Sequence, residues 1–168
     1  MKHLYLLRHG KSSWEDAGLT DHDRPLNARG RHAAKLVAEH LSRELTPIDL
    51  VLCSSARRTC QTLEGIARAL GDDVPVEVER ELYGAHCDDL LGRLRRVPTA
   101  TQSVMLVGHN PAIQELTLSL AQGGEKLARV KRKYPTGALA TLTFERDWHE
   151  LQPQDAELVA FVTPKDLG

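Results

Sequence analysis

The sequence predicts an α/β fold of three layers (α/β/α), in which helices cover both faces of a mainly parallel β-sheet. Short apolar runs of strand length alternate along the chain with longer segments in which apolar residues recur at helical spacing. Apolar runs bounded by turn residues are typical of buried strands. With 168 residues and 41% hydrophobic content, we expect a single domain, residues 1–168, with a sizeable core.

The first half of the chain contains two strand-and-helix pairs. Residues 4–7 (LYLL) form an apolar run, and after a loop rich in Asp and Pro, residues 26–44 have helical spacing with Asn27 as the capping residue. Residues 48–55 (IDLVLCSS) predict a second strand. Residues 56–70 predict a helix that is ended by a glycine.

The second half continues the alternation. Residues 74–79 predict the third strand, and residues 88–97 predict a short helix whose acidic start and basic end suit the helix dipole. Residues 103–108 predict the fourth strand, and residues 111–121 a helix that begins with a proline. Residues 126–137 are expected to form a basic loop, and residues 138–144 and 157–163 two further strands. The chain end, residues 165–168, is expected to fray.

Arginines and histidines follow three of the predicted strands. Arg8 and His9 follow the first strand, Arg58 follows the second, and His109 follows the fourth. Because ligands of such sheets bind beyond the carboxyl ends of the strands, we expect these side chains to meet at one edge. Guanidinium groups match the oxygens of phosphate, and imidazoles act as nucleophile, base or donor near neutral pH. The sequence therefore predicts a site for a phosphate dianion.

Composition excludes several classes of partner. The 22 basic and 23 acidic residues give a net charge of −1, which provides no general attraction for nucleic acids or membrane surfaces. No apolar stretch approaches the length of about 18 residues that a membrane helix needs. The three cysteines are an odd number without paired spacing, and no signal-peptide pattern opens the chain. These features predict a cytoplasmic protein that binds neither nucleic acid nor membrane.

Other catalytic chemistries fit the sequence poorly. In cysteine phosphatases, five residues separate the catalytic cysteine from an arginine. Counted from Cys53 or Cys60, this spacing does not reach an arginine. From Cys87 it reaches Arg93 only through two aspartates, which would repel a phosphate. The sequence contains neither zinc-ligand spacing nor a glycine-rich nucleotide loop. We therefore expect no catalytic metal and no cofactor.

Three motifs together resemble the histidine phosphatase superfamily, whose members have the phosphoglycerate mutase-like fold. They are LLRHGK, SSARRTCQT and LVGHN, in this order and each at the end of a predicted strand. The short length and the segment DRPLNARG are most similar to the small branch of SixA-type phosphohistidine phosphatases. The resemblance covers residues 2–120 and implies a phosphatase that uses no metal.

The resemblance also implies a role for each motif residue. His9 would be the nucleophile that carries the phosphoryl group as phosphohistidine, Arg8 and Arg58 would bind the phosphate, and His109 would donate to its oxygens. A neutral imidazole is nucleophilic at pH 7, and positioned cations stabilise the charge of the transferring phosphoryl group, so the chemistry agrees with these roles. Four further polar residues adjoin the motifs as candidate substrate-binding residues: Lys11, Ser12, Arg24 and Asn110.

Some of these assignments have an alternative. Lys11 can be a solvated loop lysine, and Arg24 can pair with Asp21 or Asp23 to shape its loop. The basic segment 126–133 can steer phosphoproteins to the site or can be a solvated loop.

A proton donor for the leaving group is the least defined part of the site. An alkoxide leaves poorly without an acid. Glu81, in ERELYGAH, matches the acid region of the superfamily, although it can also be a solvent-facing carboxylate, and His86 and Asp88 are further candidates. Without an acid, the preferred substrate has a good leaving group, such as a phosphorylated imidazole or an aryl phosphate.

These observations predict a phosphatase that acts through phospho-His9, with a histidine-phosphorylated protein as the expected substrate. One alternative is a phosphomonoesterase of the same superfamily that acts on small metabolites or aryl phosphates. Another is a module that binds a phosphate-bearing ligand without turnover. The complete set of two arginines and two histidines argues against the binding module, whereas the lack of a clear acid permits it.

Overall fold

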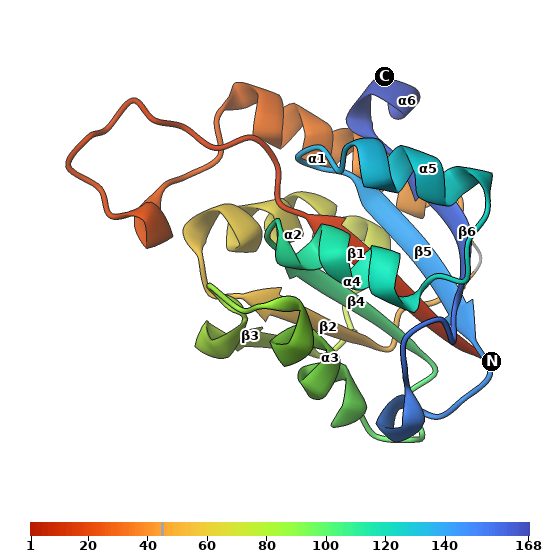
Figure 1. Ribbon diagram of the computed structural model, residues 1–168. Helices are drawn as coiled ribbons and strands as arrows, with labels where there is room; N and C mark the ends of the chain where they lie inside the picture. Colours follow the sequence, from red (N-terminus) through yellow and green to blue (C-terminus); the bar gives the residue numbers. More distant parts are fainter. Residues whose placement is uncertain (45) are drawn as a thin grey trace.

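A computed structural model of the protein describes residues 1–44 and 46–168. It has the expected three layers, with a central β-sheet between two layers of helices (Figure 1). The strands are β1 (Lys2–Arg8), β2 (Leu50–Ser54), β3 (Val76–Glu79), β4 (Ser103–Gly108), β5 (Leu139–Phe144) and β6 (Glu157–Val162). All six strands lie within a few residues of the bounds that the sequence predicts.

The helices are α1 (Ala28–Leu41), α2 (Arg57–Leu70), α3 (Cys87–Arg95), α4 (Ala112–Leu120), α5 (Glu125–Arg132) and α6 (Pro164–Leu167). Four of the helices, α1 to α4, follow strands as the alternation of the sequence predicts. Asn27 caps α1, because its side chain accepts a hydrogen bond from the Gly30 N–H. Within the described ranges, no helix is both long and apolar enough to cross a membrane.

The order of the strands brings three strand ends together. The sheet has the order β3-β2-β4-β1-β5-β6, which puts β4 between β1 and β2. These strands and β3 run parallel, whereas β5 is antiparallel to β1 and β6 is antiparallel to β5. The carboxyl ends of β1, β2 and β4 therefore lie side by side at one edge of the sheet.

Two apolar cores hold the helices on the sheet. Successive side chains of a strand point to opposite faces. Leu4 and Leu6 of β1 belong to the core beneath α3, α4 and α5, and Tyr5 and Leu7 belong to the core beneath α1 and α2. All four side chains are buried. Burial on both faces explains the uninterrupted apolar run near the start of the chain.

The structure corrects the basic loop that the sequence predicts over residues 126–137. Residues 125–132 form α5 instead. Val130 is fully buried, and Leu127 packs against the same core, so apolar residues three apart anchor the helix. The basic residues of α5 are exposed and outnumber the apolar ones, which obscures this spacing in the sequence.

The chain end, which the sequence predicts to fray, forms the short helix α6. The Thr163 hydroxyl accepts from the Asp166 N–H, and the Asp166 carboxylate accepts from the Thr163 N–H. Arg129 of α5 pairs with the same carboxylate at 2.8 Å. One ion pair thus joins the two helices that the sequence analysis did not predict.

Two glycines let α1 pack against the loop that follows β1. A Cβ at Gly10 would lie 2.8 Å from the carbonyl oxygen of Gly30, and a Cβ at Gly30 would lie 2.2 Å from that of Lys11. The Lys11 carbonyl also accepts from the N–H of Asn27. Close packing against α1 therefore requires the glycine of the Arg-His-Gly tripeptide.

We expect Gly30→Ala to destabilise the protein by about 2 kcal/mol, because the added methyl group would overlap backbone atoms of Lys11. Gly92→Ala is the matched control within α3, where an added Cβ meets nothing within 4 Å. Helix propensity predicts that Gly92→Ala stabilises the protein by about 0.5 to 1 kcal/mol. Urea denaturation followed by circular dichroism measures both, and equal stabilities of the two variants would contradict the packing role of Gly30.

Candidate active site

The carboxyl ends of β1, β2 and β4 open into a cavity of about 460 Å³. The residues that line it come from the loops after β1 and β4, the start of α2, and two further loops. Eight of the eleven candidate residues from the sequence line this cavity: Arg8, His9, Lys11, Ser12, Arg24, Arg58, His109 and Asn110.

His9 is a buried imidazole with a defined tautomer. Its Nδ1 lies 2.7 Å from the carbonyl oxygen of Gly10. Because a carbonyl can only accept, Nδ1 carries the proton and Nε2 keeps a free lone pair. Burial lowers the pKa of His9 to about 4, the Gly10 hydrogen bond opposes this, and the Arg58 and Arg8 guanidinium groups lower the pKa further. At pH 7, His9 is neutral, and its Nε2 can act as a nucleophile.

His109 lies beside His9, with their ring centroids 5.2 Å apart. Its Nε2 lies 2.7 Å from Ser54 Oγ, and its Nδ1 lies 3.5 Å from Arg58 Nη2. A guanidinium can only donate, so Nδ1 accepts and Nε2–H donates to Ser54. Burial, followed by the proximity of His9 and Arg58, lowers the pKa of His109 to about 3. Both imidazoles are therefore neutral at pH 7.

Arg8 lines the cavity and has a buried donor without a partner in the described part of the chain. Its Nη1 donates to the carbonyl of Tyr134 at 2.9 Å, while its buried Nε has no partner among the described residues. Burial and the charge of Arg58 lower the pKa of Arg8. A buried donor beside a second guanidinium is a favourable environment for a bound anion.

Asp21 is a cavity residue that the sequence indicated only as a partner for Arg24. Its carboxylate accepts from Arg24 Nη1 and Arg58 Nη2, each at 3.0 Å, and from the Tyr83 hydroxyl at 2.7 Å. The Tyr83 hydrogen bond, followed by those from the two arginines, lowers the pKa of Asp21 to about 2. Asp21 is therefore ionised at neutral pH, where it orients the arginines and cannot serve as a proton donor.

The remaining candidates form the wall and rim of the cavity. Arg24 and Ser12 are buried, and Arg24 donates to the Ser12 hydroxyl. Arg24 lines the cavity and also pairs with Asp21. Asn110 is half-buried and donates to a backbone carbonyl at 3.1 Å, whereas Lys11 is exposed.

Glu81 does not line the cavity. It lies in a single 3-10 turn, its side chain is 83% exposed, and it approaches Arg96 at 3.8 Å. Tyr83, two residues later, lines the cavity instead, with its ring centroid 5.7 Å from that of His109. The resemblance thus indicated the segment that reaches the cavity, but a different residue of that segment lies there.

The other two candidate proton donors also lie outside the cavity lining. His86 caps α3, and Asp88 is exposed in its first turn. Trp14 and Thr136 do line the cavity, although no motif indicated them. Both residues lie in loops, where the sequence has no periodicity that reveals which side chains turn inward.

The charge of the cavity favours an anion. Among the described residues, four cationic side chains line it, those of Arg8, Lys11, Arg24 and Arg58, against the single carboxylate of Asp21. Across residues 1–44 and 46–168, no three His, Cys, Asp or Glu side chains come together as potential metal ligands. The donor set of this site therefore suits a phosphate group.

Comparison with known proteins agrees with this chemistry. A family model described as histidine phosphatase superfamily (branch 1) matches residues 4–135, which include all the residues lining the cavity except Thr136. The chain belongs to the histidine phosphatase superfamily. An uncharacterised protein of Mycobacterium tuberculosis is 36% identical over 163 residues, covering 95% of this chain and all of the relative. Phosphohistidine phosphatase SixA of Escherichia coli is 27% identical over 144 residues, covering 84% of this chain and 85% of SixA.

Solved structures assign this histidine phosphatase to the SixA-type branch. A SixA-type protein from Nakamurella multipartitia matches with a TM-score of 0.87 and 29% identity, covering 97% of this chain and 96% of that chain. One from Agrobacterium tumefaciens has a TM-score of 0.81 and 34% identity, with coverage of 97% and 98%. The fold is phosphoglycerate mutase-like, as the resemblance implied, and membership supports phosphatase activity on a phosphate-bearing substrate.

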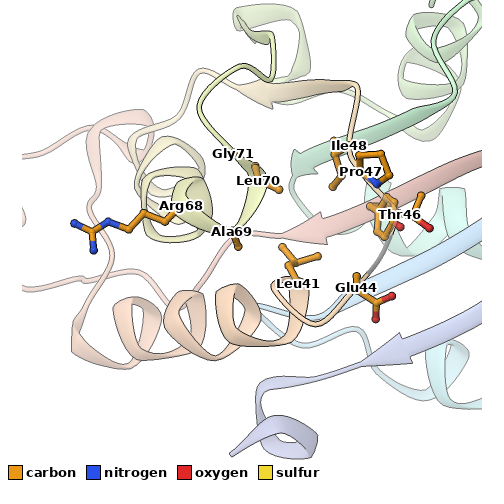
Figure 2. A pocket seen from close by; sticks show the side chains of 10 residues that line it. Leu41, Glu44, Thr46, Pro47, Ile48, Arg68, Ala69, Leu70 and Gly71 are labelled. Atoms are coloured by element: carbon orange, nitrogen blue, oxygen red, sulfur yellow. The ribbon is translucent and has the colours of Figure 1, made fainter.

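A second cavity of this histidine phosphatase, of about 350 Å³, lies at the carboxyl ends of α1 and α2 (Figure 2). Leu41, Ile48 and Leu70 line it, and Arg68 extends away from the other labelled side chains (Figure 2). No histidine or cysteine is among the described residues of its lining. It therefore differs from the first cavity, which is lined by His9 and His109.

We expect both cavity imidazoles to stay neutral from pH 7 down to about pH 5, because their pKa values are about 4 for His9 and about 3 for His109. An unfolded histidine has a pKa near 6.5. The unfolded chain therefore binds more protons than the folded protein between about pH 6.5 and 4, so these groups make stability fall as pH falls through this range. NMR titration in phosphate-free buffer, with His9→Ala and His109→Ala to assign the signals, measures both values. Midpoints near 6.5 would contradict the buried environment.

Proposed function

We propose that the protein is a phosphohistidine phosphatase that removes the phosphoryl group from a histidine of a phosphoprotein, with His9 as the nucleophile. The main support is a neutral, oriented His9 imidazole in a cavity whose single lining carboxylate, among the described residues, is ionised. The similarity to Escherichia coli SixA, which is named a phosphohistidine phosphatase, points in the same direction.

The proton balance favours a phosphorylated imidazole over an alkyl phosphate as the substrate. An alkoxide requires a proton donor when it leaves. Asp21 is unsuitable because its pKa of about 2 keeps it ionised, and Glu81 lies outside the cavity lining. The ring of phosphohistidine can take a proton from water on its second nitrogen near neutral pH, so it leaves as neutral imidazole.

The reaction has two phosphoryl transfers. His9 Nε2 attacks phosphorus, the P–N bond to the substrate breaks, and its electron pair stays with the departing imidazole. The His9 ring gains positive charge, which the hydrogen bond from Nδ1–H to the Gly10 carbonyl stabilises. Water then attacks phosphorus, Nε2 leaves with its electron pair, and inorganic phosphate and a proton are released.

Donors around His9 stabilise the transferring phosphoryl group. Its charge lies on three equatorial oxygens, so preorganised cations and N–H groups lower the barrier. The side chains of Arg8 and Arg58, which line the cavity, can donate to these oxygens. A dianion beside His109 favours its protonated form, which then donates through Nδ1.

Turnover of three compounds without added metal tests the proposal. We expect the protein to hydrolyse a phosphohistidine peptide and p-nitrophenyl phosphate. Hydrolysis of an alkyl monophosphate should be about 100-fold slower, because its alkoxide leaving group finds no proton donor in the site. A similar rate on the alkyl compound would instead indicate a working acid and a small-metabolite phosphatase. Phosphate binding without turnover of any compound would indicate a binding module.

A further inference from the structure

Trp14 is the most exposed large apolar side chain in the described part of the protein, with 74% of its surface accessible. It lines the same cavity as His9 and Arg58. The loop between β1 and α1, to which Trp14 belongs, projects from the body of the molecule (Figure 1). An exposed aromatic ring beside a polar cavity is typical of a surface that a ligand covers.

One face of the indole is held by a buried cation. The guanidinium carbon of Arg24 lies 3.1 Å from the centroid of the Trp14 ring. Arg24 is itself tied to the Ser12 hydroxyl, the Ser13 carbonyl and the Asp21 carboxylate. Because Arg24 covers one face while 74% of the side chain is accessible, the opposite face of the indole is open.

The backbone beside Trp14 is also anchored. Ser12 pairs with Leu26 in an isolated β-bridge, and the Ser13 N–H donates to the Pro25 carbonyl at 2.8 Å. The indole is thus positioned before a ligand arrives, so stacking on it requires little further ordering.

We propose that the open face of Trp14 stacks on the flat ring that bears the phosphoryl group, which makes the site selective for phosphoryl groups on aromatic carriers such as the imidazole of phosphohistidine. This inference rests on the proposed function and specifies its substrate class. With the phosphoryl group beside His9 and Arg58, a ring bonded directly to phosphorus lies at the mouth of the cavity. A ring has a π-face for Trp14 to contact, whereas an alkyl carrier has none.

Tyr83, the other tyrosine or tryptophan of the cavity lining, is less suited to this role. Its hydroxyl is bonded to Asp21, and its ring makes edge contacts with His22 and His109, at interplanar angles of 89° and 75°. Its position is set by these neighbours. Trp14 therefore offers the free ring face.

Binding of two phosphonates tests the inference without relying on turnover, because their P–C bond is not hydrolysed. Phenylphosphonate has a ring, and methylphosphonate has none. Titration calorimetry should find that the wild type prefers phenylphosphonate about fivefold. Trp14→Ala should abolish this preference and leave the affinity for methylphosphonate unchanged, while Trp14→Phe, which keeps a ring, should restore part of it.

Tryptophan fluorescence gives a second readout. Phenylphosphonate should change the emission of exposed Trp14, and methylphosphonate should not. Trp148 is fully buried, so its emission is a constant background. The emission of Trp14→Phe measures this background by itself.

Two outcomes would overturn the stacking role. One is an equal loss of affinity for both phosphonates in Trp14→Ala, which would mean that the indole only supports Arg24. The other is a ring preference that Trp14→Ala leaves intact. The proposed function can fail separately: a ring preference lost in Trp14→Ala, without hydrolysis of a phosphohistidine peptide, would support stacking and refute phosphohistidine as the substrate.

Discussion

His9→Ala is expected to lower kcat by about 10⁴-fold or more on both a phosphohistidine peptide and p-nitrophenyl phosphate, because the nucleophile is lost and the covalent route disappears. The hydrogen bond to Gly10 leaves the lone pair of His9 Nε2 free, and in the proposed mechanism this nitrogen attacks phosphorus. Mass spectrometry after rapid mixing should detect an acid-labile phosphoryl group on His9 in the wild type and none in the variant.

His149→Ala is the matched control for this substitution. His149 has a side chain that is 64% exposed and lies outside the cavity lining, so its loss should leave turnover unchanged. Circular dichroism should show that His9→Ala remains folded, and phosphate binding should persist through Arg8 and Arg58. Turnover of His9→Ala near the wild-type level, or a phosphoryl group trapped on His109, would rule out His9 as the nucleophile.

Arg58→Ala should reduce kcat/KM by about 10³-fold, since it removes a fixed cation from the transferring phosphoryl group. The adjacent Arg57 provides a control of the same residue type in the same turn of α2. Arg57 is exposed, with Nη1 3.4 Å from the Asp23 carbonyl, whereas Arg58 is buried and lines the cavity. Steady-state kinetics of Arg57→Ala should therefore match the wild type within about twofold.

Arg58→Lys separates charge from geometry. Arg58 donates Nη1 to the Asp21 carbonyl at 2.7 Å and Nη2 to its carboxylate at 3.0 Å, a pair of bonds that one ammonium group cannot reproduce. We expect Arg58→Lys to recover only a small part of the lost activity. A larger defect in Arg57→Ala than in Arg58→Ala would mean that the motif had been aligned to the wrong arginine.

Much of the fold was predictable because each signal was local. The uninterrupted apolar runs predicted strands, and both faces of β1 and β4 are indeed buried. The capping role of Asn27 depends only on residues one turn away, and the structure confirms it. Helix α5 was missed because Leu127 and Val130 are two apolar residues in a strongly basic segment, and only packing against the core reveals their face.

The residues of the candidate site divide in the same way. Arg8 ends β1, and His9 and His109 directly follow β1 and β4, so parallel strands in one sheet were sufficient to bring them to one edge. Tyr83 and Trp14 reach the cavity from loops whose paths depend on distant contacts. Nothing local in the sequence distinguishes them from exposed neighbours such as Glu81.

The sequence alone determined the alternation of strands and helices for most of the chain and the set of histidines and arginines at the strand ends, because periodicity and strand direction are properties of short segments. Only the tertiary structure decided which nitrogen of His9 is free, that both imidazoles are neutral, and that Asp21 is ionised. The physical reason is that tautomers and pKa values depend on burial and on partners such as Gly10, Arg58 and Tyr83, which folding brings together from different parts of the chain.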